Sequence, residues 1–194
     1  ITGYKISNIV IKDFHVVANA TSGDKGGMKI WGDFNNPTKN VLIEGNLVTG
    51  KGADGIKIFM GSTDIAVVGN TINGTWREEI IDFNAVENSV IAYNTLRGST
   101  GYTGITMKLG TRDVRVIGND IDIKAGTGIL VGGHGNSHLS GSYPFDMKEW
   151  GQTMAERITV EGNVINADGR SLAFVGSRDS VVQGNYLADS VGSV

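Results

Sequence analysis

The sequence predicts an all-β fold, a right-handed parallel β-helix of about seven rungs, and three observations lead to it. A short phrase of alternating apolar residues that ends in Gly-Asn or Tyr-Asn recurs along the 194 residues. The chain contains 29 Gly, about twice the average usage, which suits many tight turns. No helical period is sustained. Because short strands of this kind bury their inward faces only by stacking, the repeat indicates a solenoid.

The recurrent asparagines mark one corner of each rung. They lie 24, 24, 25, 44 and 22 residues apart, and an earlier copy of the phrase carries Asp13 in the Asn place, 33 residues before the first of them. Asn tolerates a left-handed turn, and its side chain can hydrogen-bond to the Asn one rung away. We therefore predict a sharp corner and an amide ladder formed by Asn46, Asn70, Asn94, Asn119, Asn163 and Asn185.

A second phrase predicts another strand in each rung. It reads Gly55-Ile-Lys-Ile-Phe59, Glu79-Ile-Ile-Asp-Phe83 and Gly104-Ile-Thr-Met-Lys108, with further matches at 128–131 and 171–174. Side chains alternate between the two faces of a strand. The alignment predicts two outward rows, the first with Lys57, Ile81, Thr106 and Leu130, the second with Phe59, Phe83, Lys108 and Gly132. Asp82 then falls on a position that Ile58 and Met107 hold on the neighbouring rungs.

The longer spacings locate loop insertions. We expect extra residues around 22–27 and 32–37, and a larger loop near 133–155. The larger loop contains His134, His138, Tyr143, Phe145 and Trp150. Solenoid insertions usually project from one face and often border a binding site. The aromatic side chains suit sugar rings, and packing of the loop onto the flank of the helix explains them equally well.

The composition bounds the organisation and the partners. No linker divides residues 1–194, so we expect one domain, which begins as if inside a rung and so fits a piece of a longer protein. With 17 Lys+Arg against 20 Asp+Glu, the net charge of -3 predicts no nucleic-acid surface. No apolar run reaches membrane-spanning length, so no membrane insertion is expected. The absence of Cys excludes disulfides and thiol chemistry and is compatible with a secreted, extracellular protein.

Charged residues concentrate near one predicted strand. A carboxylate at the predicted inward position of Asp82 must be paired, protonated or part of a site. Lys57, Lys108 and Arg77 could supply positive charge beside it. An ion pair with a neighbouring Lys, or a local bulge that turns Asp82 outward, is the structural alternative.

Residues 79 to 132 resemble the core of the family-six polysaccharide lyases, β-helix enzymes that include chondroitinase B and alginate lyases. The family strand Glu-Ile-Ile-x-x-Lys-Ser corresponds to Glu79-Ile-Ile-Asp-Phe-Asn84-Ala, and Leu-Thr-Leu-Arg-His-Gly corresponds to Ile105-Thr-Met-Lys108-Leu109-Gly. The family's catalytic Lys falls on Asn84, its catalytic Arg on Lys108 and the following His on Leu109. Of the family's functional residues, the Glu is kept as Glu79. The catalytic Arg is replaced by Lys108, which keeps only its positive charge.

The resemblance implies a secreted lyase that cleaves an acidic, uronate-containing polysaccharide such as alginate by β-elimination. Such an enzyme neutralises the uronate carboxylate and places a base beside C5. We assign Lys108, Asp82 and Lys57 as candidate catalytic residues, with His134 and His138 as other possible bases. Candidate substrate-binding residues are Arg77, Asn84, His134, Tyr143 and Trp150. Ca²⁺ is the candidate cofactor, and Glu79 is its candidate ligand.

Three alternatives stay open. The missing Lys and Arg pair of the family favours a non-catalytic polysaccharide-binding or adhesion module. A uronate C5-epimerase would share the proton abstraction at C5. A hydrolase would need two converging carboxylates, for which Asp82 with Glu78 or Glu79 is the candidate pair.

Overall fold

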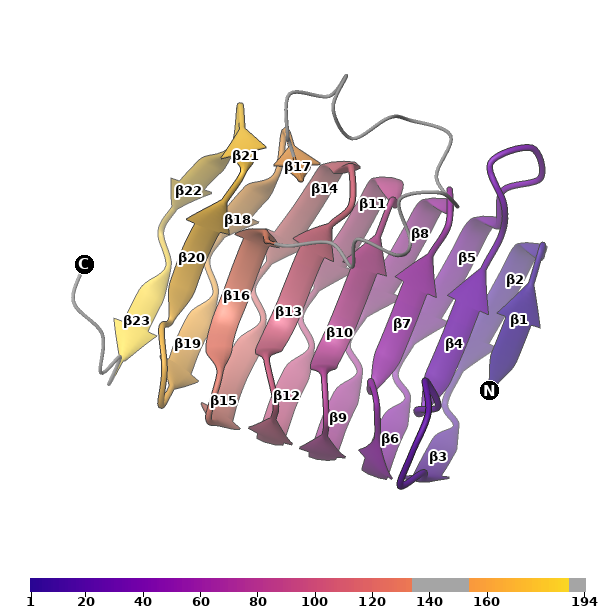
Figure 1. Cartoon of the computed structure of the whole chain (residues 1–194), viewed down its shortest axis with the longest axis horizontal. Helices are drawn as coiled ribbons and strands as arrows, with labels where there is room; N and C mark the ends of the chain where they lie inside the picture. The colour runs from indigo at the N-terminus through magenta and orange to yellow at the C-terminus, as the bar shows by residue number, and fades with distance from the viewer. Residues whose placement is uncertain (134–153, 189–194) are drawn as a thin grey trace.

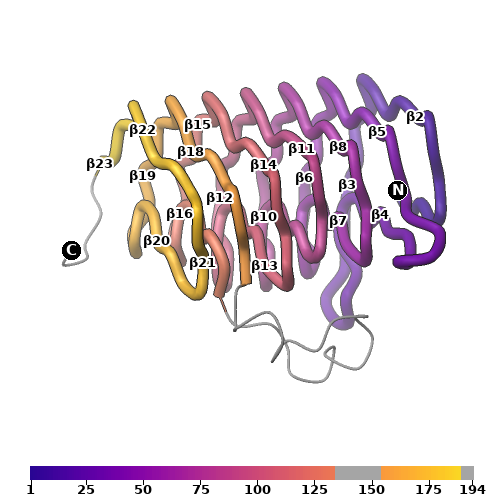
Figure 2. The backbone as a smooth tube through the Cα atoms, turned by 90° about the horizontal axis from the view of Figure 1, so that it is seen from above, coloured from indigo at the N-terminus to yellow at the C-terminus, as the bar shows by residue number. Residues whose placement is uncertain are grey.

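The computed structural model describes residues 1–133 and 154–188, which form a parallel β-solenoid of about seven turns and contain no helix (Figure 1). The predicted all-β solenoid is therefore confirmed. Most of the insertion predicted near 133–155 lies outside the described residues. Figure 2 shows the turns stacked side by side along one axis, with the first and last rungs at opposite ends.

Three parallel sheets run along the solenoid. The first sheet consists of β1 (Thr2–Tyr4), β4 (Met28–Trp31), β7 (Ile56–Phe59), β10 (Glu79–Asn84), β13 (Thr103–Lys108), β16 (Thr127–Gly132) and β20 (Leu172–Val175). The second consists of β2 (Ser7–Lys12), β5 (Lys39–Glu44), β8 (Thr63–Val68), β11 (Glu87–Ala92), β14 (Thr111–Ile117), β17 (Ala155–Glu156), β18 (Thr159–Glu161), β21 (Ser177–Arg178) and β22 (Val181–Gln183). The third consists of β3 (His15–Asn19), β6 (Leu47–Gly52), β9 (Thr71–Trp76), β12 (Thr95–Thr100), β15 (Asp120–Lys124), β19 (Val164–Ala167) and β23 (Tyr186–Ala188).

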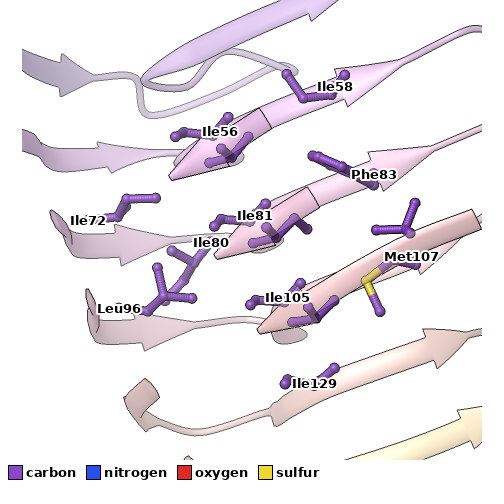
Figure 3. Close-up of a cluster of buried hydrophobic side chains, with 14 of the residues drawn as sticks. Ile56, Ile58, Ile72, Ile80, Ile81, Phe83, Leu96, Ile105, Met107 and Ile129 are labelled. Carbon is purple, nitrogen blue, oxygen red and sulfur yellow. The ribbon is translucent and has the colours of Figure 1, made fainter. Parts of the chain in front are cut away.

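The core consists of apolar rows that run along the axis inside the sheets. One row of the first sheet carries an isoleucine on each of four consecutive rungs, and Figure 3 shows these side chains packed above one another. All four are fully buried, and each contributes about 1.5–3 kcal/mol of burial free energy. They are Ile56, Ile81, Ile105 and Ile129.

The predicted asparagine ladder is confirmed. From Asn46 to Asn185, the side-chain Nδ2 of each Asn donates to the Oδ1 of the Asn on the next rung, at 2.9 to 3.0 Å. The same Oδ1 also accepts the backbone N–H of the preceding ladder Asn. Each amide thus satisfies backbone groups that the corner would otherwise leave unpaired in a buried position.

The left-handed residue of this corner is the one before the Asn, so the prediction that Asn itself makes the turn was wrong. Gly45, Gly69 and Tyr93 have φ angles of 63°, 64° and 55°. In the first rung, Asp13 takes this position with φ 60°, and Phe14 stands where the ladder Asn would be, with its N–H donating to Asn46 Oδ1 at 3.0 Å. Gly and Asp tolerate positive φ, and a turn made one residue earlier leaves the Asn side chain available for the ladder.

The two smaller predicted insertions are confirmed as loops. Residues 20–27 connect β3 to β4, and residues 32–38 connect β4 to β5. The corresponding connections one rung later, 53–55 and 60–62, are shorter. The first of these loops brings Asp24 to the outer face of the first sheet.

The predicted register of β10 was wrong by one residue. Ile81 pairs with Ile56 and Ile105, and both Ile81 and Phe83 point into the core, whereas Asp82 pairs with Lys57 and Thr106 on the outer face. Paired residues are 24 apart at Gly52 and Trp76, 25 apart at Ile56 and Ile81, and 24 apart again at Thr63 and Glu87. The turn before β10 is therefore one residue longer and the turn after it one shorter, so the asparagine spacing stays unchanged. The outward placement of Lys57, Phe59, Thr106, Lys108 and Leu130 is confirmed.

We predict that Asn94→Ala lowers the free energy of unfolding by about 3 kcal/mol, because several buried hydrogen-bonding groups lose their partner at once. Asn94 is fully buried. It accepts a hydrogen bond from the Asn70 side chain and donates one to the Asn119 side chain. Chemical denaturation followed by circular dichroism measures the change. The control is Asn73→Ala, an exposed residue of β9, which should unfold like the parent. Equal stability of the two variants would show that the ladder contributes little.

Candidate functional site

Asp82 lies on the outer face of the first sheet between two lysines of the neighbouring strands. Its Oδ2 is 3.4 Å from Lys57 Nζ, and its Oδ1 is 3.3 Å from Lys108 Nζ. Asn84 Nδ2 donates to Asp82 Oδ2 at 2.6 Å. Asp82 is 0% exposed, so it is a buried carboxylate held by two ammonium groups. The three predicted catalytic residues therefore come together, and the structural alternative of an ion pair is also correct.

Lys57 is surrounded by carboxylates. Besides Asp82, its Nζ lies 3.2 Å from Asp24 Oδ1, 3.3 Å from Asp54 Oδ2 and 3.8 Å from Glu78 Oε2. Asp24 also pairs with Lys29 of β4. Only 13% of the Lys57 side chain is exposed, and the Asp54 and Asp82 side chains are buried, so solvent screens the pairs of Lys57 with these two carboxylates weakly.

On the other side of Asp82, Glu79 contacts both Lys108 and Asp54, a residue of the turn before β7. Lys108 Nζ lies 2.7 Å from Glu79 Oε1, and the Glu79 backbone N–H donates to Asp54 Oδ1 at 3.2 Å. We call the connected set the charged cluster. Its members are Asp24, Lys29, Asp54, Lys57, Glu78, Glu79, Asp82 and Lys108.

The charged cluster holds five carboxylates against three lysines, and this imbalance shifts the ionisation of its members. Burial raises the pKa of Glu79 to about 8, and the Asp82 charge adds to this while Lys108 opposes it. Burial likewise raises the pKa of Asp54 to about 6, with Asp82 again adding. At neutral pH, Glu79 is therefore largely protonated and can donate a proton.

The two central lysines stay charged. Burial alone would lower the pKa of Lys57 and of Lys108, but the surrounding carboxylates, Asp82 first among them, raise both pKa values above the ordinary lysine value. A lysine acting as a base needs the opposite shift. Neither Lys57 nor Lys108 is therefore suited to abstract a proton, and both are suited to neutralise an anion.

Two groups of carboxylates within the described residues could hold a cation. One consists of Asp54, Glu79 and Asp82, and the other of Asp24, Asp54 and Glu78, with one oxygen of each residue within 4.8 Å of the others. Glu79 Oε2 and Asn84 Oδ1 are buried and accept no hydrogen bond from the described residues. These are the oxygen ligands that Ca²⁺ prefers, although the lysine ammonium groups compete for the same carboxylates.

The remaining predicted residues have different surroundings. Arg77 donates to the backbone carbonyls of Ala20, at 3.0 Å, and of Gly23, so it ties the 20–27 loop to the turn before β10. Asn84 contacts Asp82 and pairs in register with Lys108. His134, Tyr143 and Trp150 lie outside the described residues.

Sequence reasoning missed an aromatic row on the same sheet. Tyr4, Trp31 and Phe59 follow one another on β1, β4 and β7, with ring centroids 5.3 and 5.6 Å apart. The signal was present, because Gly27-Met-Lys-Ile-Trp31 repeats the phrase Gly55-Ile-Lys-Ile-Phe59. The insertion in the 32–38 loop changes the spacing between these two copies to 28 residues and so concealed the match.

No family model, curated protein or solved structure matches this chain. Among the described residues, none belongs to a helix of the length and apolar character needed to cross a bilayer.

We predict that Lys57→Met lowers the free energy of unfolding by about 3–5 kcal/mol, because it leaves buried carboxylates without their shared cation. Met keeps most of the side-chain length, so lost packing contributes little. Thermal and chemical denaturation at neutral pH measure the change. The matched control is Lys12→Met, since Lys12 forms an exposed ion pair with Glu44 on the second sheet and its loss should matter little. A Lys57 variant as stable as this control would contradict the prediction.

The raised pKa of Glu79 predicts a pH dependence of stability. Between the ordinary Glu pKa of about 4.5 and the folded value of about 8, the folded state binds a proton that the unfolded state releases. Stability from this group is therefore greatest at low pH and is lost as the pH rises to about 8, by an amount on the order of a few kcal/mol. Glu79→Gln should flatten this slope in denaturation curves measured from pH 5 to pH 9. An unchanged slope in the variant would rule out Glu79 as its source.

Proposed function

We propose that this chain is a polysaccharide lyase that cleaves a uronate-containing polymer by β-elimination at the charged cluster. The observation that carries the proposal is the placement of Asp82 between Lys57 and Lys108 on the outer face of the first sheet. This arrangement supplies two positive charges for a substrate carboxylate and a carboxylate base beside them. A parallel sheet of stacked rungs also offers an extended polymer a face of matching shape.

In the proposed reaction, Lys57 and Lys108 turn toward the uronate carboxylate and neutralise it, which makes the C5 proton more acidic. Asp82 accepts that proton, the C4–C5 double bond forms and the C4–O bond breaks. Glu79, protonated at neutral pH, donates its proton to the leaving oxygen. Because Asp82 is fully buried, this sequence requires the two lysines to move when the substrate arrives.

The resemblance to the family-six polysaccharide lyases supports the same assignment. Glu79 and Lys108 stand at positions of the family motif, and Lys108 Nζ lies 2.7 Å from Glu79 Oε1. Asn84, at the place of the family's catalytic Lys, pairs in register with Lys108. Since the family's Lys is absent here, we assign the role of the base to Asp82.

Ca²⁺ is a second possible source of positive charge. Of the two carboxylate groups that could hold it, Asp24, Asp54 and Glu78 would leave Asp82 and Glu79 free to act as base and acid, and the bound ion would neutralise the substrate carboxylate as the lysines do. Substrates of this kind are extracellular polymers, so we also propose an extracellular location.

A second function, that of a non-catalytic polysaccharide-binding module, is favoured by one observation. Each central lysine is already paired with carboxylates of the protein, and Asp82 is fully buried. Because the charges of the cluster are paired within the protein, its whole role could be to hold three rungs together. A uronate C5-epimerase is the catalytic alternative, since it shares the proton abstraction but returns the proton to C5.

The test is ultraviolet absorbance of the unsaturated uronate product on alginate, pectate and chondroitin sulfate, with Ca²⁺ or with EDTA. We expect the absorbance to rise on one polymer, and we expect Lys108→Ala to lower the rate about 100-fold, because it removes charge that stabilises the transition state. Lys39→Ala, which changes an exposed lysine of the second sheet, is the matched control and should keep the parent rate.

The outcomes separate the candidates. Absorbance that the Lys108 variant loses and the Lys39 variant keeps supports the lyase and identifies its polymer. Proton exchange at C5 without absorbance, detected by nuclear magnetic resonance in deuterated water, would replace the lyase with the epimerase. Neither signal on any polymer would overturn the catalytic proposal in favour of the binding module.

A further inference from the structure

The aromatic row lies on the outer face of the first sheet and leads to the charged cluster. Tyr4, Trp31 and Phe59 occupy one register row, and the next two members of that row are Asn84 and Lys108. The parallel row beside it carries Lys29, Lys57 and Asp82. A polymer lying along the axis would therefore pass from aromatic side chains to the proposed catalytic residues without leaving the sheet.

Two lysines accompany the aromatic rings. Lys29 Nζ lies 5.8 Å from the centroid of the Trp31 ring and 5.1 Å from that of Phe59, and Lys5 Nζ lies 5.0 Å from that of Tyr4. The side chains of Lys5 and Lys29 are 36% and 26% exposed. Each ammonium has three donors, and their pairing with Asp33 and Asp24 leaves donors for a further anion.

The three rings remain partly exposed although each ring packs against the next. Tyr4 is 49% exposed, and Trp31 and Phe59 are partly exposed. A ligand on this row would therefore meet apolar ring atoms beside ammonium groups. A uronate sugar has the matching character, since it combines C–H groups on its ring with one carboxylate.

The repeat of the row also suits a polymer of sugars. Neighbouring strands lie about 4.8 Å apart, which is close to the length of one sugar residue in an extended chain. On the opposite side of the charged cluster, the outward positions of the described strands are Leu130 and Ala173 in one row and Gly132 and Val175 in the other, none of which carries a charge or an aromatic ring. The two sides of the charged cluster therefore differ in what they offer to an acidic sugar.

We propose that Tyr4, Trp31 and Phe59 with Lys5 and Lys29 form binding subsites for uronate residues on the N-terminal side of the charged cluster. This inference rests on the proposed function in one respect, the place of the bond that is cleaved. That bond would lie over Asp82, and the subsites would hold the part of the polysaccharide that lies over β1, β4 and β7. The assignment of these residues to sugar binding is independent of whether the bond is cleaved.

The test is isothermal titration of the whole chain with short saturated oligomers of mannuronate, guluronate and galacturonate, with product absorbance followed in the same samples. Trp31→Leu keeps an apolar residue in the row, and Lys29→Gln removes one charge. We expect each to weaken binding of the preferred oligomer about tenfold. The matched control is Tyr93→Leu, an equally aromatic and 65% exposed position at the corner before β12, which should bind like the parent. A neutral glucan and a single-stranded oligonucleotide complete the set, and circular dichroism checks that each variant folds.

Weaker binding by both row variants and unchanged binding by the Tyr93 variant would support the subsites. Parent-like binding by the folded row variants would overturn the subsites alone, and lyase absorbance in those samples would leave the proposed function standing. Preference for the glucan or the oligonucleotide over every uronate would overturn the assignment of the subsites to uronate residues. No binding of any uronate by the parent chain would overturn both this inference and the proposed substrate class.

Discussion

The structure depends on backbone hydrogen bonds between rungs, because none of the strands in residues 1–133 and 154–188 pairs with another strand of its own turn. Each strand pairs in parallel with its counterparts one rung before and after. A side chain therefore has as its nearest neighbours the residues about 24 positions away in sequence. Every position becomes part of a row of side chains that runs along the axis. Because neighbouring side chains in a row are about 4.8 Å apart, they must be alike or must interact favourably with one another. Apolar residues satisfy this condition inside the solenoid, and asparagine satisfies it at the corner by pairing with itself.

The same condition explains how a charged cluster can persist on the outer face. A row of lysines alone would be repulsive, and so would a row of carboxylates. Lys29 and Lys57 are adjacent in one row, and Asp24 from a loop lies between their ammonium groups. Asp82 continues the row and pairs with Lys57 as well as with Lys108 of the next row. The one-residue shift of β10 is essential here, because without it Asp82 would point into the apolar core and Ile81 outward.

The fold could be predicted from sequence because stacked rungs place similar residues at regular intervals along the chain. The asparagine spacing identified the rungs, the ladder and the positions of the loops. The register of β10 could not be predicted in this way, since the longer turn before it and the shorter turn after it cancel within one asparagine interval. The charged cluster was predicted in part: Lys57, Asp82, Glu79 and Lys108 were recognised by their charge near one strand. Asp24 and Asp54 come from turns, where Asp also occurs for conformational reasons, so composition alone did not distinguish their role.

The balance of charge within the cluster bears on how any acidic ligand could bind there. Five carboxylates share three lysines, so a ligand carboxylate cannot simply be added. It must replace a protein carboxylate at Lys57 or Lys108, and the displaced group then needs a proton or a cation. Glu79 already favours its protonated form, because its pKa of about 8 lies above neutral pH, so it can release Lys108 to a ligand carboxylate without leaving an unpaired charge. Binding of an anion and ionisation of the cluster are therefore coupled, and the affinity for an acidic ligand should rise as protons are taken up. When a ligand carboxylate takes the place of Asp82 at the two lysines, Asp82 is left beside the bound ligand without its cations. A base that acts only when substrate is present needs such a freed carboxylate.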